Sequence, residues 1–363
     1  MDARSIADDR QVSSVKPRTL FFLGPQGSFT HQAAAMAARR LGQPGGNGVS
    51  LEARENVPAI IRDVEAGLGW GVIAWENSVE GYVVPNLDAV IDANDVAGLA
   101  RLSVDIAFDA FVRPRSGDAD DGNEDSEIHP YGLDGNGKES PNHHDVLREV
   151  VAHPHGLAQC TRFARERHLT PVPASSNAAA CRDVKPGQVA LGPALCGELY
   201  GLETLERNVQ DFGGANTDFL VVAPRDAVRR RLQDERCDSV VDYETIIAVV
   251  PLSTGPGVIA ELLDAVRDEG LNMTSLMSRP IKGHAGTYSF IITLDAAPWQ
   301  NNFNHLLSQI VAKGDWVKTL AVYPRGEHPN PPVDTWMLPQ GGVCLKRTQA
   351  GKVETKEERE LLW

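Results

Sequence analysis

The sequence predicts an α/β fold followed by a smaller α+β domain. Between residues 19 and 223, short apolar runs of strand character alternate with segments of helical periodicity, which is typical of sheets covered by helices on both faces. Between residues 245 and 322 the order becomes strand, helix, strand, strand, helix, strand, the order of a ferredoxin-like sandwich. A length of 363 residues agrees with two or three domains, because single domains usually contain about 100–200 residues.

The individual elements of the first region follow from local patterns. Residues 56–66 show the helical period most clearly, because apolar side chains recur three or four positions apart. We expect strands at residues 19–23, 70–75, 103–112, 146–152, 189–192 and 217–222, and helices at residues 30–41, 56–66, 87–93, 156–167, 176–182 and 194–200. In the second domain we expect strands at residues 245–252, 272–278, 287–295 and 317–322, and helices at residues 258–269 and 302–313.

Composition indicates the boundaries between these regions. Residues 114–142 are rich in Gly, Asp, Asn and Ser and have no apolar period, which predicts a solvated acidic insertion. The predicted organisation is a disordered arm at 1–17, a first α/β unit at 18–225, a charged linker at 226–243, a second domain at 244–325 and a tail at 326–363.

Charge and cysteine content narrow the class of protein. The net charge of −14 disfavours nucleic acid and anionic membranes as partners. No apolar run approaches the roughly 20 residues that a membrane span requires, and the first 17 residues lack an apolar signal core. The five cysteines are scattered without a CxxC pair, so we expect a cytoplasmic protein without a disulfide framework or a zinc site. We expect no other metal and no cofactor.

Residues 23–30 (LGPQGSFT) form the first candidate site, at the junction of a predicted strand and a predicted helix. Free backbone N–H groups at a helix start attract anions, and Gly24 and Gly27 allow a ligand to approach closely. Ser28 and Thr30 add hydroxyl donors, whereas the lysine of a nucleotide-binding loop is missing. An ordinary helix cap is the alternative interpretation.

A second candidate site, residues 75–81 (WENSVEG), follows the most apolar predicted strand. Side chains just beyond the carboxyl end of a strand are where α/β folds place ligands. Asn77 and Ser78 are therefore candidates for binding a carboxylate, carbonyl or hydroxyl, with a helix-capping turn as the alternative.

Two further segments contain polar residues at predicted helix starts. His153 and His155 have the spacing of two metal ligands in a strand, but no nearby Cys or acidic cluster completes a site, so we expect no metal there. Ser175, Ser176 and Asn177 precede an alanine run and are suited either to hold an anion or to cap the helix.

Thr217 lies within residues 211–219 (DFGGANTDF), at the start of the last predicted strand of the unit, where a fixed backbone would aim its hydroxyl. A structural turn is the alternative interpretation. Several anion-capable turns without a metal site or nucleotide loop indicate a small carboxylate ligand. They do not decide between an enzyme and a binding protein.

Taken in order, these segments resemble the prephenate dehydratase family. Five segments within residues 19–223 carry the resemblance: residues 23–34, 76–88, 153–160, 175–180 and 200–219. The order in which they occur is more specific than any single segment. The resemblance implies a bilobal, periplasmic-binding-protein-like catalytic unit that binds prephenate between two α/β lobes. Prephenate would lose its ring carboxylate as CO2 and its ring hydroxyl as water to form phenylpyruvate, a step in phenylalanine biosynthesis.

The resemblance also assigns roles to residues. It gives Thr217 the proton-donor or leaving-group role and groups Glu76, Asn77 and Ser78 with it as catalytic residues. The residues expected to bind substrate are Ser28, Thr30, Gly81, His153, Ser175, Ser176, Asn177 and Phe219.

The second domain resembles the ACT domains of the same family. Residues 255–259 (GPGVI) resemble the glycine turn of ACT domains, and residues 272–280 resemble their Asn-Leu-Thr to Ser-Arg-Pro strand. The resemblance implies feedback by phenylalanine and pairing of ACT domains in a homodimer or homotetramer. The implied effector residues are Gly257, Val258, Ile259, Asn272, Ser278, Arg279 and Pro280.

Four positions depart from the family pattern. Asp218 stands where the family has Arg after the catalytic Thr, and Ala215 stands where it has Asn. His155 replaces a usual Gln, and Met277 replaces a usual Glu. These departures leave two alternatives open: an enzyme that decarboxylates prephenate without aromatising it, and a non-catalytic amino-acid sensor.

Overall fold

The computed structural model describes residues 17–41, 48–78, 81–114, 147–236, 242–284, 286–326, 333–334 and 337–339. The chain divides into residues 1–324, which contain the helices and strands α1–α10 and β1–β15, and residues 325–363. The predicted arm, the acidic insertion and the tail fall almost entirely outside the described residues. No helix in the described ranges combines the length and apolarity that crossing a bilayer requires.

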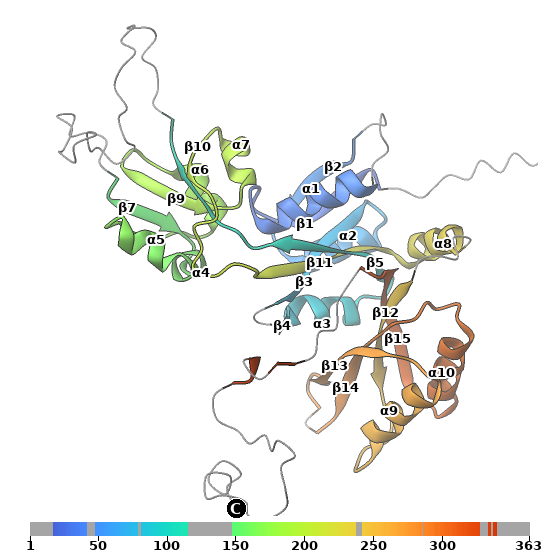
Figure 1. Cartoon of the computed structure of the whole chain (residues 1–363). Helices are drawn as coiled ribbons and strands as arrows, with labels where there is room; N and C mark the ends of the chain where they lie inside the picture. Colours follow the sequence, from blue (N-terminus) through green and yellow to red (C-terminus); the bar gives the residue numbers. More distant parts are fainter. Residues whose placement is uncertain are drawn as a thin grey trace, which may run out of the picture. The chain divides into compact units, whose positions relative to one another are not determined.

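The described strands form two sheets (Figure 1). The larger sheet has the order β13-β14-β12-β15-β5-β11-β3-β1-β2, with β4 paired to β3. Its strands are β1 (Thr19–Leu23), β2 (Ser50–Arg54), β3 (Trp70–Asn77), β4 (Gly81–Tyr82), β5 (Val96–Asp105), β11 (Asn216–Pro224), β12 (Tyr243–Val250), β13 (Met273–Pro280), β14 (Tyr288–Leu294) and β15 (Trp316–Pro324). The smaller sheet has the order β10-β6-β9-β7-β8. Its strands are β6 (Asp109–Val112), β7 (Glu149–Ala152), β8 (Thr170–Pro173), β9 (Gln188–Gly192) and β10 (Glu203–Glu206).

Helices separate most consecutive strands, as the α/β pattern predicts. In the first unit they are α1 (Phe29–Leu41), α2 (Val57–Glu65), α3 (Val84–Asp92), α4 (Pro154–Gln159), α5 (Thr161–Glu166), α6 (Asn177–Asp183), α7 (Leu195–Tyr200) and α8 (Arg225–Glu235). The second domain contributes α9 (Val258–Asp268) and α10 (Asn301–Ala312).

The first unit consists of two α/β lobes because the chain passes twice between the sheets. It leaves the large sheet after β5 and returns with β11, so the intervening strands build the small sheet. The first lobe has one core on each face of its sheet, one with α2 and α3 and the other with α1 and α8. The second lobe has separate cores beneath α4 and α5 and beneath α6 and α7. The bilobal α/β architecture expected from the sequence is thus confirmed.

The second domain has the predicted β-α-β-β-α-β order. Its antiparallel sheet runs β13-β14-β12-β15, and α9 and α10 pack on one face of it through Leu262, Val266, Phe303 and Leu306 (Figure 1). β15 continues the sheet into β5 of the first lobe through a single parallel bridge, Ala321 to Gly98. A Cβ at Gly98 would lie 2.7 Å from the Ala321 Cβ, so a side chain there would disrupt the junction.

The structure differs from the predicted elements in several places. The charged segment expected to be a linker begins with α8, whose Ala227 and Val228 are buried against the sheet. The predicted strand at 103–112 is two strands, because the chain passes from one sheet to the other between them. The predicted helix at 156–167 is interrupted at Cys160. The short strands β2, β8 and β10 were not expected from the sequence. They lie at sheet edges, and their burial does not alternate clearly, so they lack the period of two that marks a strand.

Candidate active site

Thr217 and Asn77 form the centre of the candidate site. They are direct partners in the antiparallel pairing of β11 with β3, and the Asn77 amide donates a hydrogen bond of 2.9 Å to Thr217 Oγ1. Thr217 is buried, with 8% of its surface exposed. Since the threonine oxygen accepts this bond, its own proton remains available for donation.

A β-bulge brings these two side chains to the same face. Asp218 pairs with Glu76, but Phe219 pairs with Ala74, so β3 contains one extra residue, Trp75. Strict alternation along β3 would aim Asn77 to the face of Trp75, which packs in the core with α2 and α3. Thr217 lies on the opposite face, because it pairs with Val104 of the α1-side core. The bulge therefore re-aims Asn77, a common use of bulges beside active sites.

Ser78 and Gly81 complete the end of β3. The Ser78 hydroxyl accepts a 3.0 Å hydrogen bond from Asn216 N–H, and Ser78 N–H donates a 2.9 Å bond to the Asn216 carbonyl. Gly81 pairs with Asn77 and has φ +79°, a conformation that favours glycine. These contacts fasten Asn77 and Ser78 to the residue that precedes Thr217.

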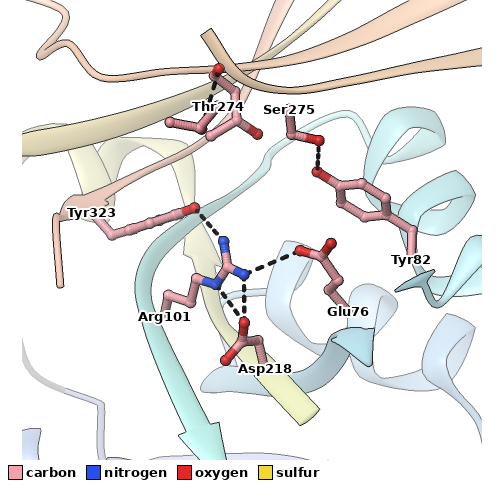
Figure 2. Close-up of polar contacts among 8 residues, drawn as sticks. Glu76, Tyr82, Arg101, Asp218, Thr274, Ser275 and Tyr323 are labelled. Carbon is pink, nitrogen blue, oxygen red and sulfur yellow. Dashed lines mark hydrogen bonds and ion pairs between the residues drawn. The ribbon is translucent and has the colours of Figure 1, made fainter. Parts of the chain in front are cut away.

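Glu76 and Asp218 point to the other face of the sheet, where they contact Arg101 of β5 (Figure 2). Arg101 Nε lies 3.0 Å from Asp218 Oδ2, and its Nη2 lies 3.1 Å from Glu76 Oε2. Burial raises the pKa of Glu76, although the charge of Arg101 lowers it. The charge reversal at Asp218 therefore does not place an anion beside the Thr217 hydroxyl.

The first candidate turn acts largely as a helix cap. Ser28 Oγ accepts a 3.2 Å hydrogen bond from His31 N–H at the start of α1, and Thr30 lies in the first turn of that helix. His31, which sequence reasoning missed, accepts a 3.0 Å bond at Nδ1 from Gly27 N–H and stacks on Phe22. Burial lowers the pKa of His31, which favours a neutral ring that holds the turn. Its position three residues after the capping serine was the available signal.

The second lobe contacts this turn through α7. Tyr200 donates a 2.7 Å hydrogen bond to the Gln26 carbonyl, and the Cys196 thiol lies 3.1 Å from the Gly27 carbonyl. These contacts join the two lobes of the unit at the first candidate turn.

His153 and Asn177 lie together in the second lobe. The Asn177 side-chain oxygen accepts a 2.9 Å hydrogen bond from His153 N–H, and this connects the starts of α4 and α6. Ser176 caps α6 through a 3.0 Å bond from Ala179 N–H, whereas Ser175 is exposed. Among the described residues, no group of three or more His, Cys, Asp or Glu side chains is arranged to hold a metal ion.

The predicted site residues thus fall into separate groups. Direct contacts join Asn77 to Thr217 and Ser78 to Asn216, and they separately join His153 to Asn177. Glu76 lies on the Arg101 face. Phe219 is almost fully buried in the core with α1, a position that favours a packing role.

The expected effector residues form two groups in the ferredoxin-like domain. Val258 lines a pocket of about 290 Å³ with Leu252, Ser253 and Lys313, next to Gly257, which has φ +93°, and the 37% exposed Ile259. The second group lies along β13 or just before it and consists of Asn272, Ser278, Arg279 and Pro280. Arg279 there donates to both carboxylate oxygens of Asp88 in α3, at 3.0 and 3.3 Å.

The remaining effector candidates have structural contacts. Asn272 donates a 2.5 Å hydrogen bond to Asp295, and Ser278 pairs with Phe290 between β13 and β14. Pro280 ends β13. Met277, where the resembling strands have Glu, packs against the core shared with the first lobe, so an apolar side chain suits its position.

Comparisons with known proteins agree with this architecture. The family model for prephenate dehydratase matches residues 20–227. A prephenate dehydratase of Mycolicibacterium gilvum strain PYR-GCK is 30% identical over 280 residues, covering 75% of this chain and 79% of the relative. The prephenate dehydratase of Arthrobacter aurescens, solved in complex with L-Phe, has a TM-score of 0.63 and 24% identity, covering 88% of this chain and 94% of that chain.

A further solved structure shares the fold under another name. GqqA, a quorum-quenching acylase, has a TM-score of 0.64 and 20% identity, covering 85% of this chain and 98% of that chain. The fold alone therefore does not determine the chemistry. The family match covers both lobes and ends just beyond β11, and together with the relative's 30% identity it shows that the chain belongs to the prephenate dehydratase family.

Proposed function

We propose that this chain converts prephenate to phenylpyruvate, CO2 and water, and that phenylalanine regulates it through the ferredoxin-like domain, as an ACT domain would. The observation that carries the catalytic part is the partly buried Asn77–Thr217 hydrogen bond at the joined ends of β3 and β11. The family match supports the same substrate.

The reaction needs a hydrogen-bond donor at the departing hydroxyl. The C–C bond to the ring carboxylate breaks as CO2 leaves, and its electrons enter the ring while the opposite C–O bond breaks. The oxygen takes up a proton and leaves as water. Thr217 is suited to donate toward that oxygen, because the hydrogen bond that its oxygen accepts from the Asn77 amide polarises the O–H bond. A threonine hydroxyl is a weak acid, so stabilisation of the developing charge matters more here than complete proton transfer.

Asp218 gives less support to the alternative chemistry than the sequence indicated. Its carboxylate pairs with Arg101 on the face opposite Thr217, with 13% of the side chain exposed. The shared ion pair with Arg101 and the greater distance across the sheet weaken its repulsion of the dianionic substrate at the Thr217 hydroxyl. Aromatising loss of both groups is therefore the activity that the geometry favours.

Regulation by phenylalanine rests on the ferredoxin-like domain. The pocket beside Val258 combines apolar side chains with Ser253, Glu261 and Lys313, a lining that suits an amino acid with an apolar side chain. The Arthrobacter aurescens relative was solved in complex with L-Phe. Polar contacts between this domain and the first lobe, such as Arg279 to Asp88, offer a physical connection to the catalytic unit.

The remaining parts of the proposal concern assembly and location. Pairing of two ferredoxin-like domains would make the protein a homodimer or homotetramer, which sedimentation analysis with and without phenylalanine would test. Cys160, Cys181 and Cys196 are buried and unpaired, in keeping with a reducing cytoplasm.

Product analysis tests the activity directly. Purified protein incubated with prephenate should generate phenylpyruvate, followed by absorbance and identified by NMR, and Thr217→Ala should lower kcat by about 10²–10³-fold. Turnover no faster than Thr217→Ala would refute catalysis by this site. A product that keeps the ring hydroxyl would instead identify non-aromatising decarboxylation.

Calorimetry tests the regulatory part. Phenylalanine should bind wild-type protein, and Val258→Asp should weaken binding at least 10-fold by placing a charge in the pocket. Exposed Tyr288→Phe serves as the matched control. Binding without prephenate turnover would favour a sensor, and no binding would refute regulation by phenylalanine.

A further inference from the structure

One guanidinium connects the strands of the catalytic centre to the ferredoxin-like domain (Figure 2). Arg101 of β5 contacts Asp218 of β11 through Nε and Nη2, and contacts Glu76 of β3 through Nη2. Its Nη1 donates a 3.4 Å hydrogen bond to the Tyr323 hydroxyl of β15. Three strands of the first lobe and the last strand of the second domain therefore meet at this side chain.

Carboxyl groups outnumber cationic side chains in the surroundings of Arg101. Its side chain is 20% exposed, those of Asp218 and Glu76 are 13% and 31% exposed, and Tyr323 is 1% exposed. Glu244 of β12, paired with Tyr323, is 4% exposed, and its Oε2 has no hydrogen-bond partner among the described residues. Without Arg101, partly buried carboxylates would lose their shared counter-ion and repel one another.

The two carboxylates that contact Arg101 belong to residues adjacent in sequence to Thr217 and Asn77. Asp218 follows Thr217 on β11, and Glu76 precedes Asn77 on β3, while Asp218 and Glu76 pair across the same ladder as Thr217 and Asn77. Because neighbouring side chains on a strand face opposite sides, an ion pair on one face fixes the backbone that aims the hydroxyl and amide on the other. The bulge in β3 lies at this same step of the ladder.

We propose that Arg101 is a positioning residue for the reaction: by holding Asp218 and Glu76 it sets the alignment of Thr217 with Asn77, and through Tyr323 it makes that alignment depend on the ferredoxin-like domain. Arg101 does not act on substrate itself, because it lies on the opposite face of the sheet. The proposal rests on the proposed dehydratase activity for its kinetic consequence, but its structural consequence is independent of any activity.

The chain offers a matched control. Arg225 at the start of α8 also donates from the first lobe to β15, through a 2.7 Å hydrogen bond from Nη2 to the Thr319 carbonyl. It has no bond to Glu76 or Asp218. Arg225→Met therefore removes a partly buried arginine and a contact with β15 without disturbing the ladder beside Thr217.

The experiment compares Arg101→Met, Arg101→Lys, Arg101→Met/Asp218→Asn and Arg225→Met in the full-length protein. Arg101→Met should lower kcat at least 10-fold while KM changes less than 3-fold, because binding groups remain and alignment is lost. Arg101→Lys should recover part of kcat, since it keeps the charge but not the forked geometry. The double variant Arg101→Met/Asp218→Asn should have a higher kcat than Arg101→Met, because it also removes one of the carboxylates that Arg101→Met leaves unpaired.

Hydrogen exchange provides a readout that needs no turnover. The backbone amides of residues 70–78 and 214–220 should exchange faster in Arg101→Met than in the wild type. The change should be smaller in Arg225→Met, measured at a temperature where both variants are folded. Unchanged exchange in both segments would overturn the proposal, and so would an Arg101→Met kcat equal to that of Arg225→Met. If wild-type protein fails to turn over prephenate but exchange responds as stated, the dehydratase proposal fails and the positioning role stands.

Discussion

Asn77 donates a hydrogen bond of 2.9 Å to Thr217 between two residues that lie 140 positions apart in the sequence. The bond exists because β3 and β11 are antiparallel neighbours and because Trp75 is an extra residue in β3. It gives the threonine hydroxyl a fixed direction and leaves its proton free to donate.

If this pair works as a unit, Asn77→Ala and Thr217→Ala should lower kcat by less in combination than the product of their separate effects. Thr217→Ser should retain part of the activity because it keeps the hydroxyl. The exposed pair Thr19 and Ser50, whose hydroxyls lie 2.9 Å apart, gives a control cycle that should leave kcat unchanged. Fully multiplicative effects would show that Asn77 acts independently of Thr217.

Glu76 should make stability fall as pH rises. Burial raises its pKa above 4.5, so the folded protein holds this proton to higher pH than the unfolded chain. The contribution of Glu76 to the free energy of unfolding is fully present below pH 4.5 and is lost as pH rises through the folded-state pKa. Denaturant unfolding should therefore show that Glu76→Gln gains stability relative to wild type between pH 4.5 and 7. A relative loss over that range would mean that Arg101 outweighs burial.

Gly156→Ala should destabilise the second lobe by about 1–3 kcal/mol. A Cβ at Gly156 would lie 2.6 Å from Asn177 Oδ1, the oxygen that accepts from His153 N–H. Gly48→Ala is the control, since nothing lies within 4 Å of its Cβ position. Equal midpoints of thermal unfolding for the two variants would indicate that Asn177 moves aside without cost.

Tyr323→Phe should reduce the response to phenylalanine more than the basal rate. It removes one 3.4 Å hydrogen bond from Arg101 but leaves both carboxylates in place. We expect kcat without phenylalanine to change less than 3-fold and the effect of saturating phenylalanine to shrink at least 2-fold. Tyr288→Phe, on an exposed part of β14, should behave as wild type. An unchanged response would show that coupling uses other contacts, such as Arg279 to Asp88.

Much of the fold could be predicted because it depends on local pattern. The apolar run of β1, the helical period of α2 and the order of elements in the second domain agree with the structure within a few residues. The break at Cys160 and the strand β8, which contains two prolines, were missed because neighbours in space stabilise them more than their own sequence does.

The sequence by itself determined the order of strands and helices, the five motif segments and the presence of Thr217 at the start of a strand, because these depend on composition and spacing along the chain. Only the tertiary structure decided which face each site residue occupies. Alternation predicts opposite faces for Thr217 and Asp218, but the bulge at Trp75 that turns Asn77 toward Thr217 arises from pairing with a distant strand. The partner of Asp218, Arg101, lies 117 positions away and reaches it only because β5 and β11 are adjacent.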